Sequence, residues 1–208
     1  MRARLLDKAL TLAAQKGPSA VSVDDVISAA EVSRGTFYKY FDAPDTLIQE
    51  LAAEVSKAVI EAMHPLVRPI TDPAKCVSQG MRTALRLVRA YPVLGAFMVR
   101  AGWPALERTH LFFTVVGVDL KKGIRTGRFT RMHLDVALNL LAGSMVGAMH
   151  SITSGRMPRD FPEQTAAALL RALGLAADEA LAIASSPLVT PSIDPTTLVG
   201  RLMAGTHS

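Results

Sequence analysis

The chain has a single cysteine, Cys76, so no disulfide can form within it. One unpaired cysteine fits a reducing compartment, and we expect a cytoplasmic protein in which Cys76 is a small, buried apolar residue. The first residues are charged and amphipathic, and they lack the apolar core of a signal peptide.

Motifs of the common enzyme classes are also missing. The sequence has no H-E-x-x-H pair, no P-loop, no G-x-G-x-x-G and no serine in a nucleophile-elbow setting. Its five histidines are scattered without metal-ligand spacing, so we expect each on the surface or hydrogen-bonded in the core. The sequence therefore predicts no metal and no cofactor, and it argues against a small helical enzyme.

Aromatic residues make up only 5% of the chain although half of it is hydrophobic, so Ala, Leu, Val and Met must fill the interior. This mixture, with little strand-like alternation, predicts an all-α protein. We expect Pro65 and Pro69 to end the helix that begins at Pro44, and Arg82, Arg86 and Arg89 to form a solvated basic stripe. The predicted helices of the C-terminal part cover residues 44–63, 73–91, 92–103, 104–126, 134–153, 162–173 and 176–185.

The net charge of +5 is unevenly distributed along the chain. Residues 1–50 contain six Lys/Arg and seven Asp/Glu, so this part is about neutral and the excess of positive charge lies in the rest. A nucleic-acid interaction must therefore be argued from the placement of a few groups.

Residues 136–155 form an uncharged run of the length that spans a membrane. Several polar side chains interrupt it, among them Asn139, Ser144 and His150, and Gly143 and Gly147 form a small-xxx-small pattern typical of close helix packing. A buried helix in a soluble dimer explains the run better, so we expect no membrane partner.

The stretch Ser33–Phe41 combines a good helix cap with several exposed-type polar residues. Ser33 is suited to cap a helix that turns Phe37 and Phe41, four residues apart, toward a core. The hydrogen-bonding side chains beside Gly35 suit a DNA groove and its phosphates, although a solvated surface helix is the plainer interpretation. The predicted DNA-binding residues are Ser22, Ser33, Arg34, Gly35, Thr36, Tyr38, Lys39 and Tyr40.

Two further helices are predicted before this stretch. Ser22, with Asp25 three residues later, resembles a capping box, and Glu31-Val32 break the short helix that it starts. A first helix ends at Gly17. Three helices whose last two form a helix-turn-helix fit a small DNA-reading head.

These residues resemble the N-terminal domain of the TetR (tetracycline-repressor) family. The resemblance covers about residues 3–51 and rests on Leu12-Ala13-Ala14-x-x-Gly17 and Ser22-x-x-Asp25-Val26-Ile27-x-x-Ala30-x-Val32-Ser33-x-Gly35-Thr36-Phe37-Tyr38-x-Tyr40-Phe41. It implies a helix-turn-helix DNA-binding domain over residues 1–46 and a helical regulatory and dimerisation domain over residues 47–208. It also implies a dimer surface near residues 134–153 and 162–173.

Two positions depart from the family pattern. Glu31 stands where the family usually has glycine, and Pro44 stands where a phosphate-contacting lysine is usual. Pro44 and the slight net negative charge of residues 1–50 support an alternative, a helical interaction protein of the same fold with weak or lost operator binding.

The C-terminal part contains a set of large, adaptable apolar side chains. Plain core packing explains each of them singly, but the family resemblance implies a ligand cavity among the helices. We expect Trp103, His64 or His150 as polar groups in it. The predicted ligand-binding residues are Met63, Met81, Phe97, Met98, Trp103, Phe112, Phe113, Met145 and Met149.

The sequence thus predicts a ligand-responsive transcriptional regulator, a repressor that binds palindromic double-stranded operator DNA as a homodimer. A small apolar or aromatic effector is expected to release it by biasing the helix over residues 44–63.

Overall fold

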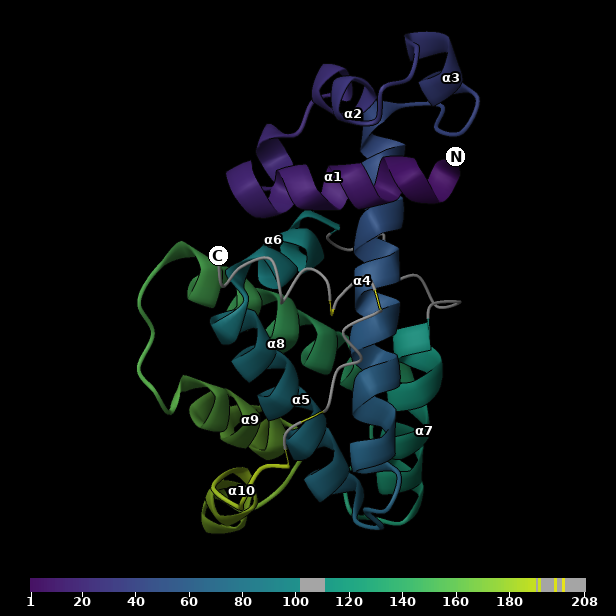
Figure 1. The fold of residues 1–208 in the computed structure, drawn as a ribbon. Helices are drawn as coiled ribbons and strands as arrows, with labels where there is room; N and C mark the ends of the chain where they lie inside the picture. Colours follow the sequence, from purple (N-terminus) through teal and green to yellow (C-terminus); the bar gives the residue numbers. More distant parts are fainter. Residues whose placement is uncertain (102–110, 190, 192–196, 198–199, 201–208) are drawn as a thin grey trace.

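The structure is a computed structural model that describes residues 1–101, 111–189, 191, 197 and 200. Helices account for its regular structure, and these described residues include no strand, which confirms the all-α prediction (Figure 1). The elements are α1 (Arg2–Lys16), the 3-10 helix η1 (Pro18–Ala20), α2 (Val23–Ala29), α3 (Arg34–Tyr38), α4 (Pro44–Val67), α5 (Pro73–Ala90), α6 (Pro92–Ala101), α7 (Leu111–Arg125), α8 (Leu134–Ser154), α9 (Phe161–Ala172) and α10 (Ala177–Ala184).

Helices α1–α3 form a head at one end of the molecule, and α5–α10 form a body at the other (Figure 1). The caps that the sequence predicts are present in the head. Ser22 Oγ accepts from the Asp25 amide at 3.2 Å while the Ser22 amide donates to the Asp25 carboxylate at 2.9 Å. Ser33 Oγ accepts from the Thr36 amide at 3.1 Å. Helix α3 is shorter than predicted. It ends at Tyr38, with Lys39 as its C-cap, so Tyr40 lies beyond the helix.

The head packs around two phenylalanines. Phe37 and Phe41 are fully buried, with ring centroids 5.5 Å apart, as their spacing predicts. The hydrophobic cluster around them extends into α4 and includes Leu87 of α5 and Leu94 of α6. The core of the head is therefore continuous with the part of the body formed by α5 and α6.

Helix α4 joins the head to the body. Pro44 lies in its first turn, where a missing N–H costs nothing, and the N-cap Ala43 provides no side-chain cap. The prediction that Pro65 and Pro69 end this helix is wrong for Pro65, because α4 continues through it to Val67 and ends just before Pro69. A proline so close to the end disturbs only the last turn. The domain boundary predicted at residues 46 and 47 falls inside α4 and stays a prediction.

Helix α5 lies at the centre of the body and contacts α4 and each of α6–α10. All four buried polar side chains among the described residues belong to it: Ser78, Gln79, Arg82 and Thr83.

The prediction of a solvated arginine stripe on α5 is wrong for Arg82, which is 2% exposed. Its Nε lies 3.3 Å from Glu163 Oε1 of α9, and its Nη2 donates to the Ser186 carbonyl at 2.6 Å. Gln79 Nε2 donates to the Val189 carbonyl at 2.8 Å. Helix α9 and the segment after α10 thus cover a face that local sequence marks as exposed.

Helix α8 is long and apolar enough to cross a membrane, but the core helix of a soluble protein passes the same test. One face of α8 packs in the body's core, and Ala137, Leu141 and Met149 on it are at most 2% exposed. Gly143 and Gly147 lie on the opposite, exposed face. A Cβ added at either would meet no described atom within 4 Å, so none of the helices that the structure describes packs against these glycines.

Candidate functional site

The predicted DNA-binding residues gather at the free end of the head, on and beside α2 and α3 (Figure 1). Thr36 is half-buried, and the rest of the set is exposed: Ser22, Ser33, Arg34, Gly35, Tyr38, Lys39 and Tyr40. Phe37 faces the other way, into the core, so α3 presents one apolar face inward and its polar face outward.

The hydroxyl groups of this set are engaged within the head. Ser22 Oγ and Ser33 Oγ accept the capping bonds of α2 and α3, and Ser33 Oγ also lies 2.9 Å from Thr36 Oγ1. A Cβ at Gly35 would meet only Ser33 Oγ, at 3.8 Å, so the fold itself does not require glycine there. The unfilled space lies on the exposed side of α3.

Carboxylates accompany most of the head's cations. Arg4 pairs with Glu31 at 3.4 Å and Lys16 with Asp25 at 2.5 Å, while Arg2 pairs with Glu50 and Arg34 with Asp24. Lys39 forms no ion pair with any residue that the structure describes.

The turn of the helix-turn-helix is strained at one residue. Glu31 has a φ of +51°, in the left-handed region that favours glycine. Glu31 therefore occupies a position whose backbone conformation suits glycine, the usual residue of the family, better than glutamate.

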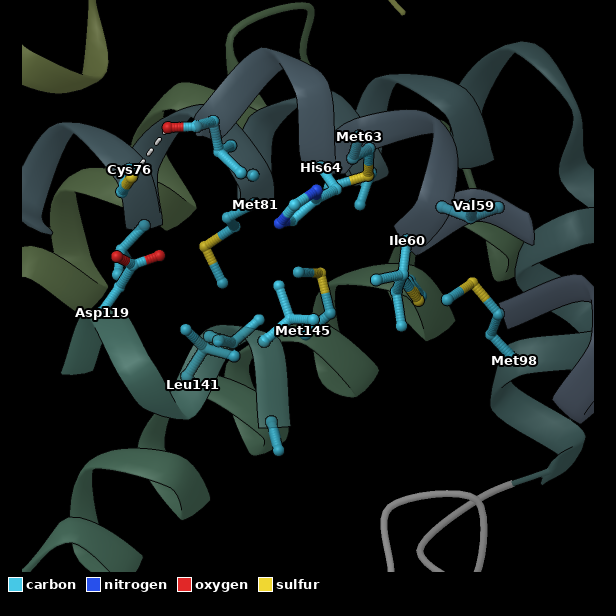
Figure 2. A pocket seen from close by; sticks show the side chains of 18 of the residues that line it. Val59, Ile60, Met63, His64, Cys76, Met81, Met98, Asp119, Leu141 and Met145 are labelled. Carbon is cyan, nitrogen blue, oxygen red and sulfur yellow. Dashed lines mark hydrogen bonds between the residues drawn. The ribbon is translucent and has the colours of Figure 1, made fainter. Parts of the chain in front are cut away.

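An apolar cavity of about 110 Å³ lies in the body, between α4, α5, α6, α7 and α8 (Figure 2). Its lining is almost wholly aliphatic and sulfur-containing. The lining residues are Val59, Ile60, Met63, His64, Val67, Cys76, Val77, Gly80, Met81, Ala84, Met98, Val115, Val116, Asp119, Leu141, Ala142, Met145, Val146 and Met149.

The structure brings together the five methionines of the predicted ligand set. Met63, Met81, Met98, Met145 and Met149 come from four helices and all border the cavity. The remaining members, Phe97, Trp103, Phe112 and Phe113, lie outside the residues whose side chains are described.

Among the described residues, three polar groups border the cavity, and only one of them was predicted from the sequence. His64 was predicted, whereas His150 is exposed and does not line the cavity. Asp119 of α7 and Cys76 of α5 were missed as lining residues. Asp119 stands after the apolar run Val115–Val118, and a carboxylate in such a helix face was a usable signal.

The surroundings of Asp119 and Cys76 are poorly solvated. Burial raises the pKa of the Asp119 carboxyl above its ordinary value. Burial, with the nearby Asp119 charge, raises the pKa of the Cys76 thiol to about 12. Cys76 Sγ donates to the Val67 carbonyl at 3.3 Å, so this thiol is a structural group and an unreactive one.

The chain matches two sequence models of one family. The model described as "Tetracyclin repressor-like, C-terminal domain" matches residues 72–186, and "Bacterial regulatory proteins, tetR family" matches residues 5–51. The chain belongs to the TetR family. It is a transcriptional regulator of the helix-turn-helix type.

This TetR-family regulator is similar to RolR over nearly its whole length. The structure of RolR in complex with its ligand resorcinol is 32% identical, with a TM-score of 0.78, and the match covers 93% of this chain and 96% of RolR. RolR without ligand gives 32% identity and a TM-score of 0.81 over 92% of this chain and 100% of RolR.

Two uncharacterized HTH-type transcriptional regulators of Mycobacterium tuberculosis, from strains H37Rv and CDC 1551, are each 29% identical over 94 residues. These matches cover 45% of this chain and 46% of theirs, so the chain spans about half the length of the curated relatives it matches.

Proposed function

We propose that this regulator is a homodimeric repressor that binds a palindromic operator and is released by a small single-ring aromatic effector. The main support for a link between the cavity and the head is the position of Val59 on α4. This side chain borders the cavity and also belongs to the hydrophobic cluster of the head. A molecule that fills the cavity therefore touches a member of the same hydrophobic cluster that forms the core of the head.

The cavity limits the size of the effector. An engineered apolar cavity of about 150 Å³ holds benzene, so a cavity of about 110 Å³ favours an effector no larger than a single ring. RolR was crystallised with resorcinol, a single ring with two hydroxyl groups. The methionine lining favours an apolar ring of this kind.

The polar groups of the cavity select for hydrogen-bond donors. The Asp119 carboxylate accepts hydrogen bonds and repels anions, while His64 can donate or accept. An uncharged phenol donates to Asp119, whereas an aromatic acid brings a second negative charge beside it. We therefore assign the effector to the uncharged hydroxylated aromatics.

The proposed response is a shift between two arrangements of α4. The effector acts only to the extent that it binds one arrangement more tightly than the other. Contact with Val59, Ile60 and Met63 gives it such a preference, because all three lie on the helix that carries the head.

The proposed dimer uses α8 and α9. Gly143 and Gly147 are exposed and open, and Val136 on the same helix is 49% exposed, so α8 offers a flat apolar surface to a second subunit. Such a dimer has two heads, which suits two half-sites about 34 Å apart.

The alternative of an interaction protein with lost operator binding rests on Pro44 and on the slight net negative charge of residues 1–50, and the ion pairs of the head agree with it. Selection of DNA from a random pool by the purified protein separates the two functions. We expect an enriched palindrome whose half-sites lie about one helical turn apart. Failure to enrich any sequence would favour the alternative.

The selected operator then tests the effector. Resorcinol added to the complex in a gel-shift titration is expected to release the DNA, and benzoate at the same concentration serves as the anionic control. Release by benzoate but not by resorcinol would overturn the effector class while leaving operator binding intact.

A further inference from the structure

One ion pair on the exposed face of the head joins the two helices of the helix-turn-helix. Arg34, the first residue of α3, donates through Nη2 to the carboxylate of Asp24 in the first turn of α2. The two side chains are 60% and 71% exposed. A pair so open to solvent contributes little to folding stability, and the head already has a buried core around Phe37 and Phe41.

The contact does restrict Arg34. A guanidinium is a rigid plane with five N–H donors, and a carboxylate bound to one of its nitrogens narrows the range of directions in which that plane can lie. The other donors are enough to reach N7 and O6 of one guanine, which is the commonest specific contact of arginine in the major groove. An arginine that is already oriented loses less side-chain freedom on binding.

The same carboxylate works against DNA affinity in general. Asp24 places a negative charge on the face that the phosphates approach, in a head that already has one more acidic than basic residue over positions 1–50. Asp24 is thus expected to lower the affinity for DNA while it raises the discrimination between sequences. A negative charge acting by itself would lower the affinity for all sequences equally.

We infer that Asp24 is a positioning residue for DNA recognition, which orients Arg34 toward a guanine and so sets the base preference at one position of each half-site. This inference rests on the proposed operator binding. It predicts that Asp24 raises discrimination between sequences while it lowers the affinity for all of them.

The test compares the affinity for the selected operator with that for a variant changed at one base pair in both half-sites. The base pair is the one at which Arg34→Ala loses its preference. Fluorescence anisotropy at fixed salt gives the ratio of the two Kd values. A bidentate arginine–guanine contact gives roughly 5- to 150-fold discrimination in each half-site, so the ratio for both half-sites is roughly the square of that factor. We expect Asp24→Asn to reduce that ratio at least about fivefold and to bind unrelated DNA as tightly as the parent or more tightly.

Asp42→Asn is the matched control. It removes the same charge from an exposed residue of the head, so it should tighten binding to every sequence and leave the ratio unchanged. Thermal melts followed by circular dichroism check that both variants fold like the parent.

An unchanged ratio in Asp24→Asn would overturn the inference, and so would an equal loss in Asp42→Asn. Full base discrimination in Arg34→Ala would overturn it as well. A parent protein that selects no sequence at all would overturn the proposed function together with this inference, so the two failures are distinguishable.

Discussion

Met98 borders the cavity one helical turn away from Leu94, which is fully buried in the head's hydrophobic cluster. Both lie on α6, so this helix contacts the cavity with one turn and the head with the turn before. Gly95 lies between them and is also buried.

Gly95→Ala should displace α6. A Cβ at this position would lie 2.4 Å from Val88 Cγ1 and 2.7 Å from Thr153 Cγ2, which is closer than real contacts allow. We expect a loss of about 1–3 kcal/mol in the free energy of unfolding, measured by urea denaturation. The helical preference of alanine offsets this by up to about 1 kcal/mol.

Gly80→Ala is the control for that helical preference. The glycine lies inside α5, and its added Cβ would meet only Met63 Cε, at 3.8 Å. This variant should be as stable as the parent or more stable. Equal stabilisation by both alanines would show that α6 has room at Gly95.

Glu31→Gly should stabilise the head. The residue has a φ of +51°, which costs a side chain about 1–2 kcal/mol, while glycine adds some entropy to the unfolded chain. We expect a net gain of about 1 kcal/mol in thermal or urea unfolding. Glu31→Ala removes the contact with Arg4 but keeps the strained backbone, so it should bring no gain. A gain of equal size in both variants would assign the effect to charge.

Glu163→Gln should destabilise the body by about 3 kcal/mol, because it leaves the charge of Arg82 buried without its partner. Burial lowers the pKa of Arg82, yet a guanidinium keeps its charge at any pH of interest. Arg86→Ala also removes a bond to Glu163. Since the Arg86 side chain is 51% exposed, this control should cost at most about 1 kcal/mol.

The same pair predicts a pH dependence. Burial raises the pKa of Glu163, but hydrogen bonds from Arg86 and Arg82 outweigh it and hold the pKa below its ordinary value of 4.5. The stability from this ionised group is present above pH 4.5 and is lost as the pH falls through the lower folded-state pKa. Acid titrations should show a smaller loss for Glu163→Gln than for the parent.

Asp119→Asn should weaken resorcinol binding by about 10- to 100-fold, because a hydrogen bond to a charged group contributes about 1.5–3 kcal/mol. Burial raises the pKa of Asp119, so in the parent the affinity should also fall as the pH drops through that raised value. The Asn variant should lack this pH dependence in calorimetric titrations. Met145→Leu changes the apolar lining conservatively and should alter the affinity only a few-fold. Equal losses in both variants would mean that Asp119 does not bind the hydroxyl.

Gly147→Leu should weaken the proposed dimer without unfolding the subunit. No described atom lies within 4 Å of an added Cβ, so the larger side chain is accommodated in the monomer. Across a close helix contact it should cost about 1–3 kcal/mol, which is a roughly 5- to 150-fold rise in the dimer Kd. Analytical ultracentrifugation measures this constant. A parent protein that is monomeric at micromolar concentration would contradict the dimer.

Local rules predicted the head well. Ser22 and Ser33 cap the helices that their sequence neighbours indicate, and Phe37 and Phe41 are buried as a spacing of four requires. These features depend on residues within one or two turns, which a sequence displays directly. The early end of α3 escaped prediction because no glycine or proline marks it.

The body was less predictable because its decisive contacts join distant residues. Arg82 and Glu163 are 81 positions apart, so the burial of this arginine has no local signal. Asp119 reaches the cavity only because α7 packs beside α4 and α5. The cluster of methionines was recognised by type, whereas the order in which helices surround the cavity depends on tertiary packing.

The hydrogen bond from Cys76 to Val67 ties the last turn of α4 to α5. Along the helix axis, about 12 Å separates Val59 from that tie and about 35 Å separates Pro44 from it. A straight helix that turns about its tied end moves Pro44 about three times as far as Val59. Pro65 lies beside the tie, where its missing N–H weakens the last turn and eases such a rotation. A shift of about 0.5 Å in Val59 would then move the start of α4, and the head with it, by about 1.5 Å. A rotation of α4 about the Cys76–Val67 hydrogen bond would thus amplify a small displacement at the cavity about threefold at the head.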